Sequence, residues 1–215
     1  MRNILLFITL ILLLASTWMA LTKGRIEGPS ANPDSPVRNI IYAHVPSSIC
    51  SLFCFVVLLV TSIGYLSTSN ESWDRVSAAT AEVGLIFATV LNATGSIFSR
   101  AEWGPWWSAS PRLVSSAVLW FLYIVYLILR SSLPGSKQRR ARVCAVFAII
   151  AFLDVPMVYI SARYMPDIHQ PSFTFDNLWQ RVAFIMGIVS TMLVAAMLIW
   201  TKTDILKIKS RLEAE

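Results

Sequence analysis

Residues 182–201 have the sequence VAFIMGIVSTMLVAAMLIWT, a run without a charged side chain. A helix of about 20 such residues spans the hydrocarbon core of a bilayer, which is roughly 30 Å thick. Further apolar stretches of similar length precede it in the chain, at 4–21, 45–66, 78–98, 113–129 and 143–162. Together they predict an all-α, polytopic integral membrane protein: a bundle of six transmembrane helices, with residues 1–215 forming a single membrane domain.

The overall composition favours lipid as the solvent of this chain. Of its 215 residues, 56% are hydrophobic and only 14% are charged, and the mean hydropathy is +0.63. The net charge of +6 does not indicate a nucleic-acid partner, because the Lys and Arg residues lie between the apolar stretches. Cys50, Cys54 and Cys144 show no disulfide or metal-binding spacing and are expected to be small buried side chains.

The first apolar stretch, at 4–21, has two possible interpretations. It resembles a secretory signal peptide in position, but it is longer than the usual apolar core of about 7 to 15 residues. No clear cleavage site of small residues precedes Lys23. We therefore expect this stretch to be a membrane helix.

Two basic segments predict the orientation of the bundle. Short loops rich in Lys and Arg remain on the cytoplasmic side, so the connector 130–142 and the tail 202–215 are expected in the cytoplasm. Alternation through six spans then places the connectors 22–44, 99–112 and 163–181 on the outer side.

The expected outer side carries side chains suited to a flat ring that contains iron. Both histidines of the chain, His44 and His169, lie in outer connectors, and the connector 99–112 holds Trp103, Trp106 and Trp107. Imidazole is a common axial ligand of haem iron, and indoles pack against a flat macrocycle. Cations for the haem propionates are available on the same side, at Arg38, Arg100 and Arg112.

Each of these features also has a purely structural explanation. Tryptophan is enriched at membrane interfaces, and an interfacial histidine often only caps a helix. Glu82 and Asp154 lie within apolar stretches and are functional candidates by position, although Asp154 precedes Pro156 and is also suited to hydrogen-bond a broken helix. Two other functions therefore stay open: a membrane haem b electron-transfer subunit, whose histidines normally lie at membrane depth, and a membrane assembly protein without a cofactor.

Several segments resemble the haem exporter protein C (CcmC) family of cytochrome c maturation proteins. They occur in the order of the family between about residue 38 and residue 200, and they are RNIIYAHVP at 38–46, the tryptophan-rich WGPWWSASPRL at 103–113, VPMVY at 155–159 and IHQ at 168–170. The tryptophan-rich segment is of the type called WWD and is the most specific of these signals.

The resemblance implies a haem-handling role without an enzymatic reaction or catalytic residues. It implies non-covalent, transient binding of b-type haem at the outer face, with His44 and His169 as axial ligands of the iron and with a surrounding site formed by Trp103, Gly104, Trp106, Trp107 and Arg112. It further implies delivery to a membrane-tethered haem chaperone, alongside the ATP-binding cassette subunits of the maturation complex. The location implied is the bacterial inner membrane, with the haem site facing the periplasm.

The tryptophan-rich segment departs from the family pattern at two positions. Relatives usually continue as Trp-x-Trp-Asp before Pro-Arg-Leu, but Ala109 and Ser110 stand here in place of the last Trp and the Asp. The missing indole predicts weaker retention of haem, and the missing carboxylate changes the surroundings of Arg112. The fold and the positions of the histidines are expected to be unaffected.

Overall fold

A computed structural model describes residues 2–26, 36–165 and 175–213 of the chain, and the regular elements in these ranges are helices. In order they are α1 (Arg2–Thr22), the short 3-10 helix η1 (Pro36–Ile40), α2 (Ile41–Thr68), α3 (Glu71–Trp103), α4 (Pro111–Ser132), α5 (Lys137–Ala151), α6 (Asp154–Tyr164) and α7 (Leu178–Leu212). With η1 continuing into α2 and α5 into α6, the described residues form six helices long and apolar enough to cross a membrane. The prediction of an all-α polytopic bundle is confirmed.

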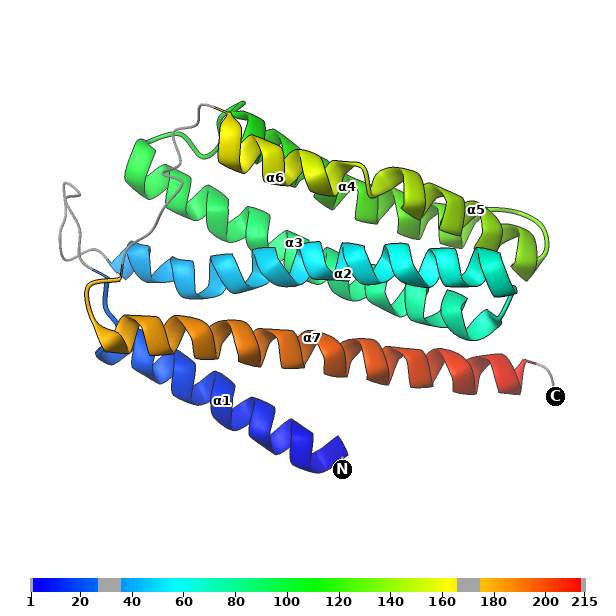
Figure 1. The fold of residues 1–215 in the computed structure, drawn as a ribbon, viewed down its shortest axis with the longest axis horizontal. Coiled ribbons are helices and arrows are strands. Elements are labelled where there is room, and N and C mark those ends of the chain that lie inside the picture. The colour runs from blue at the N-terminus through cyan, green and yellow to red at the C-terminus, as the bar shows by residue number, and fades with distance from the viewer. Residues whose placement is uncertain (1, 27–35, 166–174, 214–215) are drawn as a thin grey trace.

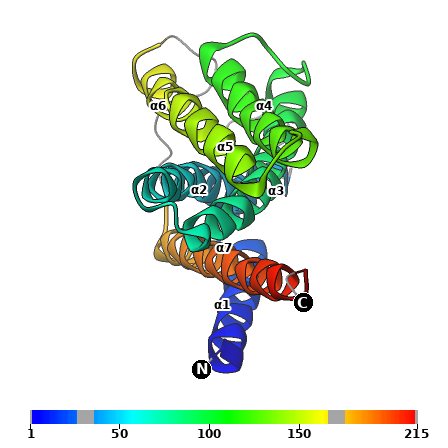
Figure 2. The same cartoon turned by 90° about the vertical axis from the view of Figure 1, so that its right-hand side faces the viewer.

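The helices pack in layers around a central pair. The antiparallel helices α2 and α3 have the most extensive contact and lie in the middle of the bundle (Figures 1 and 2). On one side they are covered by α4 and by the α5–α6 segment, and on the other side by α7. Helix α1 packs chiefly against the outside of α7, and most of its large apolar side chains are exposed, as expected for contact with lipid.

The close approach of α4 to the central pair depends on a glycine of α3. The side chain of Tyr123 on α4 lies directly against Gly84, where a Cβ atom would collide with its ring. This allows the Tyr123 hydroxyl to donate a hydrogen bond of 2.7 Å to the carbonyl oxygen of Ser51 on α2. Small residues allow such approaches in membrane bundles, where interhelical packing replaces the hydrophobic effect as the main attraction. Nearby, the thiols of Cys50, Cys54 and Cys144 are buried and not cross-linked, as predicted.

The observed helix ends differ from the limits of the apolar stretches. Helices α3 and α7 extend well beyond 78–98 and 182–201. Asn70 caps the start of α3 by accepting a bond from the Ser72 amide, and Asn177 caps α7 in the same way. The predicted tail from residue 202 continues α7 through Leu212, because it contains neither Gly nor Pro.

The predicted stretch 143–162 is divided by a break between α5 and α6. Pro156 has no amide donor for the carbonyl of Phe152, and that carbonyl instead accepts from the Val155 amide at 3.0 Å. The break is therefore a consequence of the proline. One carboxylate oxygen of Asp154 is buried beside it, with no hydrogen-bond partner among the described residues.

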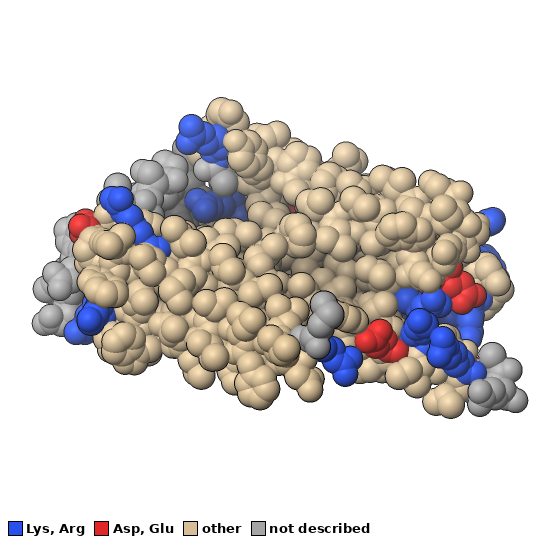
Figure 3. Space-filling view, turned by 60° about the horizontal axis from the view of Figure 1, so that its bottom comes forward, with Lys and Arg blue, Asp and Glu red and all other residues tan. Residues whose placement is uncertain are grey.

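The two ends of the bundle contain the segments that sequence alternation assigns to opposite sides. At one end, here called the tail end, Lys137 after the α4–α5 turn forms an ion pair of 2.7 Å with Glu213 after α7. At the other end, here called the tryptophan end, the segment after α1 is bonded to the first turns of α2 and α7. There Tyr42 donates to the carbonyl of Gly24 at 2.6 Å, and Gln180 donates to the carbonyl of Arg25 at 2.9 Å. Charged residues gather at these ends, while the middle of the face in Figure 3 shows almost none.

Glu82, a functional candidate by its position in an apolar stretch, has a structural partner. Its carboxylate lies 2.6 Å from the ammonium group of Lys202 on α7. This ion pair joins α3 to α7 towards the tail end, and it accounts for a charged residue within the apolar stretch of α3.

Candidate functional site

The tryptophan connector, defined as residues 104–110, is bound to the last turns of α3 through its own backbone. Ser96 donates to the carbonyl of Trp106 at 2.9 Å, and Ser99 donates to the carbonyl of Pro105 at 2.8 Å. The Arg100 guanidinium donates to the carbonyl of Gly104. Three consecutive carbonyl groups are thus held by one face of α3, since residues three and four apart share a helix face. The connector is consequently fixed relative to the bundle.

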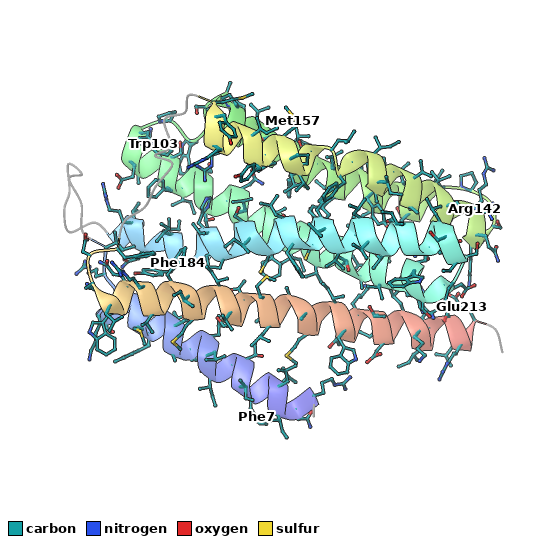
Figure 4. All side chains as sticks on the ribbon, viewed as in Figure 1. Phe7, Trp103, Arg142, Met157, Phe184 and Glu213 are labelled. Atoms are coloured by element: carbon teal, nitrogen blue, oxygen red, sulfur yellow. The ribbon has the colours of Figure 1, made fainter. Side chains whose placement is uncertain are left out.

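A sharp turn at Gly104 separates one tryptophan from the other two. Gly104 has a φ of +93°, a conformation that side chains with a Cβ atom rarely adopt. Before it, Trp103 ends α3 (Figure 4) and packs edge-to-face on Phe98, with ring centroids 5.4 Å apart. After it, Trp106 and Trp107 are 58% and 51% exposed. The turn therefore presents two indoles on the surface of the tryptophan end.

His44 is the fourth residue of α2 and faces α3. Its Nδ1 atom is 3.0 Å from the Oγ1 atom of Thr94, and its ring lies beside Gly95. Gly95 and Ser99 are four residues apart on α3, so they share a face and differ by about 6 Å along the helix axis. The structure thus brings His44 to the same part of α3 that holds the connector.

Of the two remaining predicted site residues, the structure describes Arg112 but not His169. Arg112 is in the first turn of α4, directly after the connector, and is partly buried. His169 lies outside the described residues. Of the proposed site, the structure therefore brings together His44, the connector with its flanking Trp103, and Arg112 at the tryptophan end.

Two arginines predicted to bind a haem carboxylate have partners within the protein. Arg38 forms an ion pair of 2.9 Å with Glu102, whose side chain is largely buried. Arg100 donates to Gly104, and its guanidinium carbon lies 6.0 Å from the centre of the Trp106 ring. Arg38 and Arg100 therefore have structural roles at the tryptophan end.

Sequence reasoning missed the polar residues that build the site from α3. Thr94, Gly95, Ser96 and Ser99 form a short polar run in an otherwise apolar stretch, and this run was the available signal. The hydroxyls of Ser108 and Ser110 in the connector were also missed. They are buried and have no hydrogen-bond partner among the described residues. Polar groups of this kind suit a ligand that carries hydrogen-bonding atoms.

The fold and the site define a polytopic membrane protein that presents an imidazole, two exposed indoles and an arginine at one end of its bundle. The sequence model of heme exporter protein C matches residues 1–214 of the chain. The chain belongs to this family, and the resemblance stated from its motifs is confirmed.

Several known proteins match the chain at low identity. The "Heme exporter protein C" of Bradyrhizobium diazoefficiens is 28% identical over 163 residues, which cover 74% of this chain and 62% of that protein. A "Putative cytochrome c biosynthesis ccmC-like mitochondrial protein" of Marchantia polymorpha is 26% identical, over 77% of this chain and 66% of that protein. The "Heme exporter protein C" of Rhodobacter capsulatus is 25% identical over 89% of this chain and 84% of that protein. The chain thus spans less than two thirds of the first two relatives.

Proposed function

We propose that this chain binds haem at the tryptophan end and delivers it for cytochrome c maturation. The observation that carries the proposal is the connector itself, whose backbone is held by the part of α3 that also contacts His44 and whose Trp106 and Trp107 rings are about half exposed. Large exposed apolar surface usually marks a binding site. Haem matches this set of donors, because it needs an imidazole for its iron and aromatic surface for its macrocycle.

Each residue of the site has a distinct proposed role. His44 and His169 are the axial ligands of the haem iron. Trp106 and Trp107 pack against the macrocycle, while Trp103 and Gly104 fix the start of the connector. Arg112 pairs with a propionate group, for which a bidentate guanidinium is well suited.

An open site suits a cargo that must leave again. The indoles are at the surface of the bundle and the connector lies outside the helices, so a bound ring can be taken up or released without separating α2 from α3. This supports non-covalent, transient binding of b-type haem. It also disfavours the alternative of a haem b electron-transfer subunit, since His44 lies near a helix end and not in the middle of the membrane.

The charges of the bundle support a site that faces outward. The basic connector and tail favour a cytoplasmic tail end, which places the tryptophan end at the outer face of a bacterial inner membrane, towards the periplasm. A membrane-tethered haem chaperone would receive the haem there, and ATP-binding cassette subunits of a maturation complex would carry out any ATP chemistry. The chain itself would act as a single membrane domain, since α2 and α3 contact both outer layers. Its proposed role is to handle haem and not to carry out an enzymatic reaction.

The haem content of purified variants tests this proposal. We expect His44→Ala and His169→Ala each to lower the haem per protein in a pyridine haemochrome assay, and imidazole to restore part of it in the corresponding Gly variants. Trp107→Ala should lower it as well. Its control is Trp200→Ala, which removes a tryptophan of similar exposure, 49% against 51%, towards the tail end.

The proposal has a clear contrary result. If the His44→Ala, His169→Ala double variant retains as much haem as the unchanged protein, the two histidines are not the ligands. If the unchanged protein neither contains haem nor takes up added haemin, the chain is an assembly protein without haem.

A further inference from the structure

We infer that Thr94 and Gly95 of α3 are positioning residues that orient the His44 imidazole with Nε2 as its ligand atom, an inference that rests on the proposed role of His44. Neither residue would touch the haem. They would act through the ring of His44, one by a hydrogen bond and the other by leaving room for it.

The surroundings of Thr94 favour one tautomer of His44. The Thr94 hydroxyl oxygen lies 2.6 Å from the carbonyl oxygen of Val90 and 3.1 Å from that of Leu91, both on its own helix. A hydroxyl group that donates its one proton to such a carbonyl has a lone pair for the contact of 3.0 Å with His44 Nδ1. In the arrangement that we infer, His44 donates from Nδ1–H and carries its ring lone pair at Nε2.

This arrangement is the one that a metal-binding imidazole requires. A ligating histidine coordinates through one nitrogen and usually donates the other N–H to an oxygen acceptor of the protein, which fixes both the tautomer and the ring plane. The Thr94 hydroxyl supplies this acceptor from a different helix, 50 positions away in the sequence. Because carbonyl groups of α3 can accept the proton of the Thr94 hydroxyl, Thr94 does not need His44 as an acceptor.

Gly95 provides the space that the ring occupies. A Cβ atom at this position would lie 3.0 Å from Cε1 of His44 and 3.6 Å from Nδ1. The first distance is shorter than ordinary van der Waals contact, so a side chain here would displace the ring. Gly95 has no positive φ, so its lack of a side chain is explained by this contact and not by backbone conformation.

The state of His44 can be tested without haem. In a His169→Gln background the chain has one histidine, so the imidazole ¹⁵N NMR signals of the haem-free protein in detergent belong to His44. We expect the Nδ1–H tautomer in the unchanged background and in Thr94→Ser, and a shift to the Nε2–H tautomer in Thr94→Val. The matched control is Thr89→Val, which removes another threonine of α3 that donates to its own helix at 2.8 Å and accepts from a ring N–H of another helix, the Trp120 indole on α4, at 2.8 Å.

Haem retention is measured in the same substitutions with His169 intact. Loss of an outer partner of a metal ligand typically weakens metal binding about 10- to 100-fold, and we expect a loss of this size for Thr94→Val. Gly95→Ala should also weaken retention, while Thr94→Ser and Thr89→Val should keep it within about twofold.

The outcomes separate this inference from the proposed function. An Nε2–H tautomer in the unchanged background overturns the inference, whatever the haem content. A tautomer that depends on Thr94, combined with normal haem retention in Thr94→Val, also overturns the positioning role. If His44→Ala keeps its haem, the proposed role of His44 as an iron ligand fails even where the tautomer result holds.

Discussion

The two ends of the bundle use their polar side chains in different ways. At the tail end charged side chains pair with one another: Arg130 binds both carboxylate oxygens of Asp74 at 2.7 and 2.6 Å, and Lys137 binds Glu213. At the tryptophan end Arg38 and Glu102 also pair, but further polar side chains of α3 bind backbone carbonyls of the connector. The first arrangement joins helices, whereas the second holds a loop whose indoles remain exposed.

This difference indicates where a ligand can be bound. Charged side chains that pair with one another fix the helices and the orientation of the bundle, but few of their hydrogen-bonding groups remain available for a ligand. A loop that is fixed through its backbone keeps its side chains available, so rigidity and exposure occur together in the tryptophan connector. We therefore expect changes at the tail end to affect stability, and changes at the tryptophan end to affect haem.

The largest expected effect is on chemical labelling across the membrane. Ala109 and Gln138 are exposed at opposite ends of the bundle. In intact cells, a thiol reagent that does not cross membranes should label Ala109→Cys fully and Gln138→Cys not at all, because the basic connector is expected in the cytoplasm. The native cysteines are buried and serve as the unlabelled control. Labelling of both variants, or of Gln138→Cys alone, would contradict the proposed orientation.

Next in size is the loss of the Arg130–Asp74 ion pair. Asp74→Ala leaves a largely buried guanidinium without its carboxylate, and we expect the free energy of unfolding in detergent to fall by about 2 to 3 kcal/mol. The control, Glu71→Ala, removes a 64% exposed carboxylate from a weaker pair of 3.5 Å with Arg75 on the same helix, and should cost less than about 1 kcal/mol. Haem content should stay unchanged in both. An equal loss of unfolding free energy in the two variants would show that the stability of the tail end does not depend on the Arg130–Asp74 pair.

A comparison of two glycines separates stability from haem binding. Gly104 and Gly135 lie in turns at opposite ends and have φ values of +93° and +110°. Replacement by Ala should strain either turn by about 1 to 3 kcal/mol. Only Gly104→Ala should also lower haem retention, because it moves the start of the connector. If haem retention falls equally in Gly135→Ala, the effect reports general destabilisation and not the connector.

The smallest expected effect is a gain in haem retention on replacing Ala109, where the chain departs from the family pattern. Stacking of an aromatic side chain on a flat ring contributes about 1 to 3 kcal/mol in base-binding proteins. At the exposed position of Ala109 we expect the lower end, so that Ala109→Trp raises haem retention by up to about tenfold. Arg112→Ala should lower the retention and Trp106→Ala should lower it further. If Ala109→Trp and Trp106→Ala both leave haem content unchanged, the connector is an interfacial anchor.

The fold was largely predictable from hydropathy, while the helix ends were not. Lipid excludes charged and unpaired polar groups, so the apolar stretches locate the spans. They do not locate the ends, which depend on caps such as Asn70 and Asn177 and on the helix-forming residues beyond the membrane. The break before α6 could be recognised in advance, because Pro156 cannot donate a hydrogen bond to Phe152.

The site was predictable by residue type but not by contact. His44, Trp106 and Trp107 have unusual chemistry for a membrane segment, and this made them candidates. Thr94 and Ser96 were missed because hydroxyl side chains are common within membrane helices. Their roles depend on contacts with residues distant in sequence or beyond the end of α3, which spacing alone does not reveal. Arg100 was assigned from its expected side of the membrane, and only the structure shows that it binds Gly104.

The packing of α1 against α7 has a consequence for biosynthesis. The Thr9 hydroxyl on α1 contacts the sulfur of Met197 on α7 at 3.7 Å, across 188 positions of sequence. A ribosome adding roughly 5 to 20 residues per second needs about ten seconds or more to produce that partner. During this interval α1 must stay in the bilayer without α7, which is feasible because a helix satisfies its own backbone hydrogen bonds. The packing of α1 against α7 can therefore form only after the rest of the bundle has been synthesised.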